Sequence, residues 1–299
     1  MRILVTGGTG FIGSNIVEAL IARGDEVLIT GHDAEQRPKG FTGKFLQPSL
    51  LGLDWDSIGH IDALIHEAAI NETQSTDERE MMRANVDSSL ALFEYAVKNG
   101  CKHIVYASST AVYGDGPTPY KEDQELRPLT AYARSKKALD EKATAFAAAR
   151  PEVTVVGLRY CNVYGPGESH KGRRASMIYQ IAQQMKKGNP RIFKDGSQTR
   201  DYIYVKDVVA ANLLALSAKE SAVVNCGSGQ ATSFNEVINI LNEAMGLNRT
   251  PEYFENPIAS TYQNHTECDM SLAKQKLGFV PTFDIKKEIV DWTKNGLLG

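Results

Sequence analysis

Three glycines near the N-terminus constrain the fold of this chain more than any other feature. Gly7, Gly10 and Gly13 directly follow the apolar run of residues 3–5 and precede a helix-compatible stretch, residues 14–23. Glycine suits a tight strand-to-helix turn, close approach of the backbone to a pyrophosphate, and close packing of the helix on the sheet. Helix N-termini also present backbone N–H groups to phosphates, so we include Phe11 and Ile12 in the predicted site. The segment predicts a dinucleotide-binding turn.

Apolar strand-like runs alternate with helix-period segments through the first half of the chain. This alternation is typical of a parallel sheet covered by helices on both faces. We therefore expect an α/β protein with a Rossmann fold, which is a doubly wound parallel sheet. Helices are expected over 81–98, capped by Thr76 or Asp77 and ended by Gly100, and over 132–149. The expected strands are 2–6, 26–30, 44–47, 63–66, 103–108 and 153–159.

The alternation breaks down after Tyr160, and the second half indicates a smaller, mixed α/β C-terminal substrate domain. We expect 1–165 to form the dinucleotide-binding domain and 166–299 to form mainly the substrate domain. A segment of about 201–228 is expected to return to the first domain, as chains of this size often interleave their units. The expected helices are 175–187, 207–218, 233–245, 272–277 and 285–295, and the expected strands are 191–194, 201–205 and 223–226.

Charge and cysteine content exclude several classes of function. Lys plus Arg number 33 and Asp plus Glu 36, which leaves a net charge of −3 over 299 residues and no global field that attracts nucleic acid or membrane. No apolar stretch has membrane-spanning length and no signal region opens the chain, so we expect a cytoplasmic protein. The cysteines form no Cys-x-x-Cys pair, so we expect reduced thiols and no metal at Cys101, Cys161, Cys226 and Cys268.

A tyrosine and a lysine lie four residues apart at the start of an expected helix. Tyr132 and Lys136 would share one helix face, which permits an acid–base pair. The ordinary tyrosine pKa near 10 is too high for a base at neutral pH, so a nearby lysine cation and the positive ring of a nicotinamide cofactor would be needed to favour the phenolate. Ser109, at the end of an expected strand, would hydrogen-bond the same substrate oxygen. We predict that these three residues are catalytic.

The glycine turn and the Ser–Tyr–Lys group, taken together, resemble the extended short-chain dehydrogenase/reductase family. Its closest groups are the ADP-glycero-manno-heptose 6-epimerases and the UDP-glucose 4-epimerases. The resemblance implies an NAD(P)-dependent isomerase that oxidises a nucleotide-activated sugar to a carbonyl intermediate and returns the hydride to the opposite face. Dehydratases of this family carry an Asp–Glu pair where this chain has Thr110 and Ala111, so we do not expect dehydration. The matching stretches are 65–69, 81–85, 162–166, 169–172, 175–176, 200–205 and 262–263.

The same resemblance assigns further site residues. Lys171 matches a second acid–base lysine of the heptose enzymes, although it also fits a solvated loop lysine in a basic run. Arg200 matches an arginine that pairs with a nucleotide diphosphate, and a surface ion pair with Asp201 or Asp207 is the alternative. The remaining assignments are Asn162, Arg173, Ser176, Phe193 and Tyr262 for the substrate, and Glu67, Ala68, Ala69, Asn85, Lys136 and Val163 for the cofactor.

The cofactor is expected to be NADP or NAD, held tightly because one hydride is lent and returned in each turnover. Gly31 stands where many relatives place the carboxylate that holds the adenosine ribose. Without that charge a 2′-phosphate is not repelled, so His32, Arg37 and Lys39 favour NADP. An interaction of Asp33 with the ribose would instead favour NAD. Arg173 also departs from the heptose enzymes, which have a small residue at that position.

Three alternatives stay open. A UDP-hexose 4-epimerase is the alternative within the family, because the sequence does not name the sugar. A reductase that consumes external NAD(P)H would exchange its cofactor with solution, whereas an epimerase would retain it. A non-catalytic NAD(P)-binding protein is disfavoured because Ser109, Tyr132 and Lys136 are all present. We expect a nucleotide-diphosphate sugar as substrate and a homodimer or higher homo-oligomer, with helices 81–98 and 132–149 available for pairing.

Overall fold

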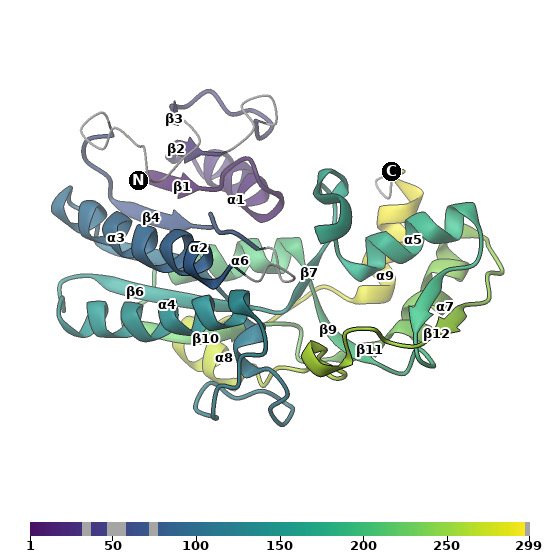
Figure 1. Ribbon diagram of the computed structural model, residues 1–299. Coiled ribbons are helices and arrows are strands. Elements are labelled where there is room, and N and C mark those ends of the chain that lie inside the picture. The colour runs from purple at the N-terminus through teal and green to yellow at the C-terminus, as the bar shows by residue number, and fades with distance from the viewer. Residues whose placement is uncertain (32–36, 47–57, 72–76, 297–299) are drawn as a thin grey trace.

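A seven-stranded parallel sheet forms the centre of the larger lobe (Figure 1). The computed structural model describes residues 1–31, 37–46, 58–71 and 77–296. The order of the strands reverses direction at β1, which lies between β2 and β4, and such a reversal opens a crevice at the carboxyl ends of the strands. Across the sheet the strands are β10 (Ala222–Cys226), β6 (Thr154–Tyr160), β5 (His103–Ser109), β4 (Ala63–His66), β1 (Arg2–Thr6), β2 (Glu26–Thr30) and β3 (Phe45–Leu46).

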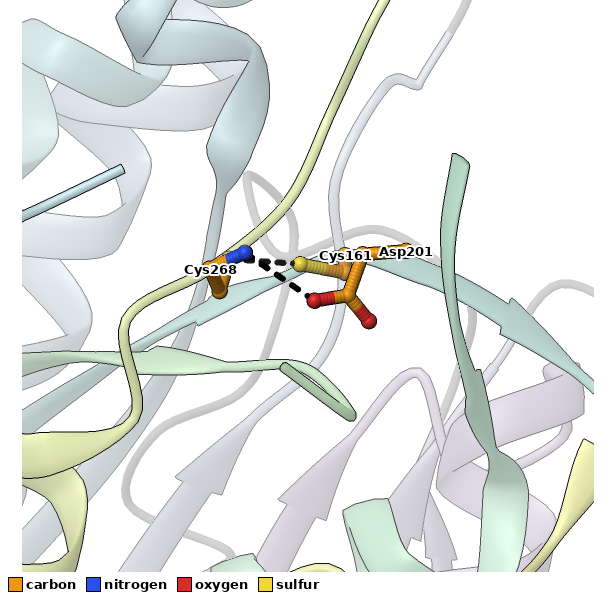
Figure 2. A group of neighbouring side chains, drawn as sticks. All are labelled: Cys161, Asp201 and Cys268. Atoms are coloured by element: carbon orange, nitrogen blue, oxygen red, sulfur yellow. Dashed lines mark hydrogen bonds between the residues drawn. The ribbon is translucent and has the colours of Figure 1, made fainter. Parts of the chain in front are cut away.

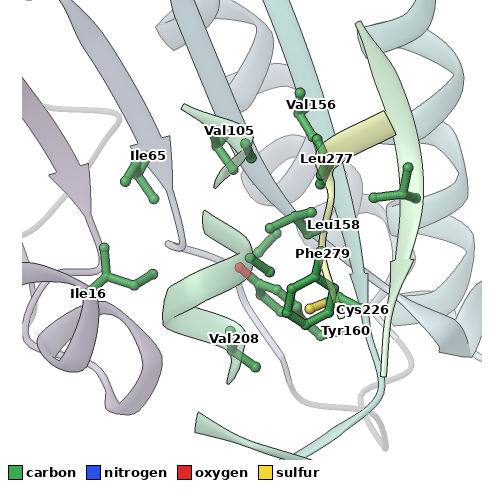
Figure 3. Packing of buried hydrophobic residues seen from close by; sticks show 14 of the residues in the cluster. Ile16, Ile65, Val105, Val156, Leu158, Tyr160, Val208, Cys226, Leu277 and Phe279 are labelled. Atoms are coloured by element: carbon green, nitrogen blue, oxygen red, sulfur yellow. The ribbon is translucent and has the colours of Figure 1, made fainter. Parts of the chain in front are cut away.

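Helices cover both faces of this sheet, and each face has its own apolar core. One core joins α1, α6 and α8 to the sheet, and Figure 3 shows Ile16 of α1 and Val208 of α6 near Ile65 and Val105. The other core joins the sheet to α3 and α4. The helices are α1 (Phe11–Ala22), α6 (Val205–Ala215) and α8 (Ser271–Leu277) on one face, with α2 (Glu78–Met82), α3 (Ser88–Lys98) and α4 (Ala131–Ala148) on the other.

The smaller lobe has a core of its own, built largely from aromatic side chains. Trp292 and Tyr164 are fully buried there, and Tyr164 also contacts Tyr202 and Tyr204. Small sheets and helices surround this core (Figure 1). The elements are β7 (Asn162–Tyr164), β8 (Arg191–Phe193), β9 (Thr199–Tyr204), β11 (Ala231–Ser233), β12 (Glu252–Phe254), α5 (Met177–Lys187), α7 (Phe234–Met245) and α9 (Ile285–Lys294), with β7, β9 and β11 in one sheet and β8 and β12 in another.

The chain passes between the lobes several times, for example after β9 and after β12. After β9 the chain returns to the large sheet, because α6 packs in the core with α1 and β10 pairs with β6 in parallel. Residues 262–270, which we call the interlobe strap, then run between the lobes. The strap accepts a hydrogen bond from Thr199 N at Asn264 O, and it brackets Tyr120 through Glu267 O and Asp269 N.

The Rossmann fold expected from the sequence is confirmed, with local differences. The expected helix 81–98 is divided by a π-helical turn, η3 (Arg83–Asp87), in which side chains compete for the backbone: Ser88 donates to Arg83 O. Asp77 is the N-cap and accepts from Glu80 N, while Thr76, the other expected cap, lies outside the described residues. Strands β7, β11 and β12 were not expected, because their pairing partners β9 and β8 lie far along the chain. The 3-10 turns are η4 (Thr110–Tyr113), η5 (Ser169–Arg174) and η6 (Ala259–Thr261).

No helix in the described ranges combines the length and the apolarity needed to cross a membrane.

Gly13 provides a test of the packing at the first turn. A Cβ at Gly13 would overlap the carbonyl oxygen of Gly7. We expect Gly13→Ala to destabilise the protein by about 1–3 kcal/mol, since overpacking outweighs the better helix propensity of alanine. Gly188→Ala is the matched control, because Gly188 has φ 172° and a Cβ added there would meet no atom within 4 Å. Chemical denaturation measures both, and equal stability of the two variants would contradict the close approach.

Candidate active site

The glycine turn lies at the carboxyl end of β1, beside the end of β4. Gly7 has φ +68°, a left-handed conformation, and a Cβ there would meet Ala68 N at 2.9 Å. Gly10 is the N-cap of α1, so the first N–H groups of the helix, at Phe11 and Ile12, have no partner within the helix. These N–H groups and the missing side chains form a surface that fits a pyrophosphate. The turn therefore suits a dinucleotide cofactor.

A chain of hydrogen bonds anchors the end of β4. His66 is buried and contacts Thr6 Oγ1 through Nδ1 at 2.6 Å and Ser89 Oγ through Nε2 at 2.8 Å. Ser89 donates onward to Asn85 O, so its oxygen accepts from Nε2–H and Nδ1 accepts from Thr6. Burial, aided by Lys136, lowers the His66 pKa to about 3. His66 is therefore a neutral structural link between β1, β4 and η3.

Asn85 ties the loop after β4 to the catalytic helix. Its Oδ1 accepts from Ile70 N at 2.8 Å, and its Nδ2 donates to Ile70 O at 2.9 Å and to Ser135 Oγ at 3.0 Å. Ser135 in turn donates to Tyr132 O. The side chain of Asn85 thus fixes the distance between the loop at Ala68 and the first turn of α4, and its expected role as a cofactor contact stays a prediction.

Ser109, Tyr132 and Lys136 are brought together as the sequence predicted. Thr130 caps α4 by accepting from Ala133 N, and the hydroxyls of Tyr132 and Ser109 share a hydrogen bond. Lys136 is buried, its Nζ donates to Ala107 O at 2.7 Å, and it lies 5.8 Å from the centroid of the Tyr132 ring.

The charges of this group are set by burial. Burial raises the Tyr132 pKa to about 12, and the bond from Ser109 only partly opposes that shift. Burial lowers the Lys136 pKa to about 8, opposed by the carboxylates of Glu67 and Asp140. Lys136 alone therefore does not bring the tyrosine pKa toward neutrality, and the positive charge of an oxidised nicotinamide ring would be needed as well, as expected from the sequence.

Asp140 and Arg159 form a buried pair that the sequence interpretation did not include. Asp140 lies one helical turn beyond Lys136 on the same face of α4, and its Oδ2 accepts from Arg159 Nε at 2.9 Å. Tyr106 donates to Oδ1 of the same carboxylate, and Arg159 donates to Tyr113. The i+4 spacing after Lys136 was the signal in the sequence that could have identified Asp140. This pair joins α4 to β5 and β6 behind the catalytic group.

Lys171 lies over the start of α1 and not in solvent. Its Nζ is 4.9 Å from the centroid of the Phe11 ring, and burial lowers its pKa, opposed by Glu168. Glu168 is fully buried and holds the loop by accepting from Gly165 N and from both N and Oγ of Ser176. The loop thus places an ammonium group at the cofactor side of the crevice. Ser176 is occupied in this role and as the N-cap of α5.

Other residues near this loop are more exposed. Arg173 is exposed, and its neighbour Arg174 donates to Asn71 Oδ1 across the crevice at 3.1 Å. Asn162 is partly buried in β7 and donates to Asp201 O, while Val163 packs against the core below α1. None of these positions excludes the roles expected from the sequence, which stay predictions.

Arg200, Tyr262 and Phe193 meet in the smaller lobe, although they come from β9, the strap and β8. The Arg200 guanidinium lies 4.8 Å from the Tyr262 ring centroid and 5.5 Å from that of Phe234, and Tyr262 packs edge-on to Phe193 at 5.5 Å. Among the described residues no carboxylate pairs with Arg200, whose guanidinium donates to Thr199 O at 2.7 Å. A buried guanidinium without a counter-ion is suited to an incoming diphosphate.

The sequence left open a surface ion pair between Arg200 and Asp201. The carboxylate of Asp201 instead has other partners. It accepts four hydrogen bonds, from Ser228 N and Oγ, Gly229 N and Cys268 N. Figure 2 shows Cys268 beside Cys161, with the two Sγ atoms 2.8 Å apart, so thiols distant in sequence become neighbours. Four backbone and side-chain donors already occupy the carboxylate beside these thiols. Asp201 thereby fastens the strap to β9.

The expected cofactor-selectivity region is only partly described. His32 and Asp33 lie outside the described residues, and Arg37 and Lys39 are exposed nearby. A Cβ at Gly31 would overlap the side chain of Thr9 in the glycine turn. Packing against Thr9 therefore gives a steric reason for glycine at this position that is independent of the cofactor.

Comparisons with known proteins agree with this geometry. Residues 3–227 match the model of the NAD dependent epimerase/dehydratase family. The ADP-L-glycero-D-manno-heptose-6-epimerase of Alkalilimnicola ehrlichii is 35% identical over 289 residues, which cover 90% of this chain and 89% of the relative. The crystal structure of the Helicobacter pylori ADP-L-glycero-D-manno-heptose-6-epimerase matches with a TM-score of 0.87 and 31% identity, covering 98% of this chain and 95% of that chain.

A similar likeness extends to an enzyme with a different sugar. The UDP-glucose 4-epimerase of Thermus thermophilus, solved in complex with NAD, matches with a TM-score of 0.85 and 30% identity, covering 98% of this chain and 99% of that chain. The resemblance stated from the sequence is confirmed at the level of the family. With its glycine turn, its Ser–Tyr–Lys group and this match, the chain is an enzyme that belongs to the NAD dependent epimerase/dehydratase family.

Proposed function

We propose that this enzyme epimerises a nucleotide-activated sugar through a transient carbonyl, in the manner of an ADP-heptose 6-epimerase. The observation that carries the proposal is the placement of two separate proton-transfer groups at one crevice. Tyr132 with Ser109 comes from α4 and β5, and Lys171 reaches the start of α1 from the opposite lobe. If the intermediate turns between the two hydride transfers, its carbonyl oxygen can meet one proton donor before the turn and another after it, and these two groups could serve in that way.

The residues divide the chemistry between them. A bound nicotinamide cofactor would accept one hydride and return it. Tyr132 would take the proton of the sugar hydroxyl as the carbonyl forms, and Ser109 would hold the same oxygen. Lys136, anchored on Ala107 O, would supply positive charge beside the phenol. Lys171 would exchange a proton with the carbonyl oxygen after the intermediate has turned in the site.

The nucleotide is proposed to lie across the smaller lobe, with its diphosphate on Arg200 and its base near Tyr262 and Phe193.

Only the nicotinamide class of the cofactor follows from the family. The Thermus thermophilus relative holds NAD, and the steric role of Gly31 against Thr9 leaves the earlier preference for NADP without support. Extraction and mass spectrometry of the cofactor from purified protein decide between NAD and NADP.

A UDP-hexose 4-epimerase is the second candidate, favoured by the likeness to the Thermus thermophilus enzyme. The two candidates differ in the need for Lys171, because a 4-epimerase can use the tyrosine for both proton transfers.

We also propose that the chain assembles as a homodimer or higher homo-oligomer. Analytical ultracentrifugation of the purified protein would measure the oligomeric state.

Tyr132→Phe tests the central proton transfer. Loss of the hydroxyl is expected to lower kcat about 10²- to 10⁴-fold, the usual contribution of a general base, with cofactor content unchanged. Tyr95→Phe is the matched control, because the Tyr95 hydroxyl donates to Gly59 O at 3.4 Å, before the start of β4 and therefore at the other end of the sheet. Epimerisation of ADP-heptose and UDP-hexose is followed by NMR. An unchanged rate of epimerisation in Tyr132→Phe would contradict the proposed mechanism.

Lys171→Met distinguishes the two candidate reactions. If Lys171 is the second acid–base group, kcat for the heptose is expected to fall about 10²-fold or more while cofactor binding persists. Lys187→Met is the control, since Lys187 is an exposed lysine of the nearby α5. Undiminished epimerisation of a UDP-hexose by Lys171→Met would instead establish the 4-epimerase.

Arg200→Met tests the diphosphate site separately from catalysis. We expect nucleotide diphosphate to bind about 10- to 100-fold more weakly, because hydrogen bonds to charged groups contribute about 1.5–3 kcal/mol. The thermal stability of the variant is expected to change little, since among the described residues no carboxylate would lose its partner when Arg200 is replaced. Calorimetric titration with ADP and UDP, and thermal unfolding, measure the two effects. Arg127→Met, which replaces an exposed arginine, is the control. If Arg200→Met binds the nucleotide as tightly as the unchanged protein does, Arg200 is excluded from the site.

A further inference from the structure

A chain of three hydrogen-bonded side chains ends at a carboxylate beside the catalytic lysine. Asn212 Nδ2, from α6, donates to Tyr160 Oη at 2.8 Å, and Tyr160, from β6, donates to Glu67 Oε1 at 2.7 Å. The second proton of Asn212 Nδ2 goes to Val208 O at 2.9 Å. Because Tyr160 accepts from the amide, its own proton points to Glu67. The chain therefore presents a donor to the carboxylate and favours its charged form.

Strand register places Glu67 beside the anchor of Lys136. His66 pairs with Tyr106 between β4 and β5, so Glu67 and Ala107 are the next residues along these parallel strands. Lys136 Nζ donates to Ala107 O. Glu67 approaches this point from the face covered by α6, whereas Lys136 comes from α4 on the other face. Both charges therefore lie at the carboxyl ends of β4 and β5, and they approach from opposite faces of the sheet.

Other charged groups near Lys136 are already committed. Asp140, on the same helix, is paired with Arg159 at 2.9 Å. His66, on β4, is neutral because burial lowers its pKa to about 3. Burial also raises the Tyr132 pKa to about 12, so the phenol is neutral as well, and the buried thiol of Cys226 on β10 has a raised pKa. Of the two described carboxylates that act on Lys136, Glu67 is therefore the one without a cation of its own.

We propose that Glu67, held by Tyr160 and Asn212, is the counter-charge that keeps Lys136 protonated, and so acts on Tyr132 as a positioning residue through Lys136. The inference rests on the proposed function only in its kinetic consequence. Burial alone would drive Lys136 toward the neutral amine, and a cationic nicotinamide ring would drive it further. A fixed carboxylate opposes both effects. Burial raises the Glu67 pKa to about 7, and the hydrogen bond from Tyr160 and the charge of Lys136 oppose that shift. Burial lowers the Lys136 pKa to about 8, and the carboxylates of Glu67 and Asp140 oppose that shift.

Glu67→Gln removes the charge and keeps an oxygen that can accept from Tyr160. The titration of Lys136 is read directly by NMR of protein labelled with ¹³C at lysine Cε, and the Lys136 signal is the one missing in Lys136→Arg. We expect the midpoint in Glu67→Gln to fall by about one pH unit or more, the usual effect of losing a near opposite charge. An unchanged midpoint overturns the proposal. This measurement uses the protein as purified and needs no sugar, so it stands whether or not the proposed reaction is correct.

Kinetics give a second readout that a purely structural role would not move. Glu67 raises the pKa of both Lys136 and Tyr132, so its neutralisation is expected to shift the whole pH profile of kcat toward acid. Tyr160→Phe keeps the carboxylate but removes its donor, and we expect a smaller shift in the same direction. A lower kcat with an unmoved profile in both variants would overturn the role.

The matched control is Glu122→Gln. Glu122 is a partly buried carboxylate that accepts from Asn225 N at 2.7 Å, and it is not among the groups that act on Lys136. Its neutralisation is expected to leave the Lys136 midpoint and the position of the pH profile unchanged. A shift as large as that of Glu67→Gln would show a general charge effect and overturn the specific pairing.

Discussion

The close approach of α1 to the turn after β1 is the contact on which the rest of the structure depends. A Cβ at Gly13 would overlap the Gly7 carbonyl, and one at Gly7 would press on Ala68. Because both positions lack side chains, the ends of β1 and β4 and the first turn of α1 converge on one small surface. The crevice, the free N–H groups of the helix and the place that Lys171 reaches over Phe11 all follow from this convergence.

Around that crevice the protein keeps its ionisable groups in a low dielectric and fixes their charges with hydrogen bonds. His66 stays neutral between Thr6 and Ser89, while Asp140 is satisfied by Arg159. Lys136 is left with one backbone acceptor and the carboxylate of Glu67 nearby. Burial strengthens each of these effects, since a charge out of water depends on its few remaining partners. Residues on both faces of the sheet therefore set the charges of the catalytic group.

Much of the fold was predictable because strands 2–6, 26–30 and 63–66 are continuous apolar runs with clear turns between them. The triplets β7, β11 and β12 were not, since their register is set by pairing partners far along the chain. The helix 81–98 shows the same limit, because its π-helical turn accompanies side-chain bonds from Ser88 and Asn85 that periodicity does not reveal. Ser109, Tyr132 and Lys136 were found because they lie near one another in sequence on a strand end and a helix start.

The sequence by itself determined the family, the parallel sheet and the presence of a nicotinamide site, since glycine placement and apolar period are local properties of the chain. Only the tertiary structure decided which charges meet. It joined Glu67 to Tyr160 and Asn212, placed Arg200 against Tyr262 without a counter-ion among the described residues, and brought Cys161 to Cys268 behind Asp201. The first pairing arises because the strands of the parallel sheet are ordered by crossovers rather than by sequence, and the other two arise because the interlobe strap returns to residues far from it in the chain. The electrostatics of the site depends on distances that composition and spacing do not contain.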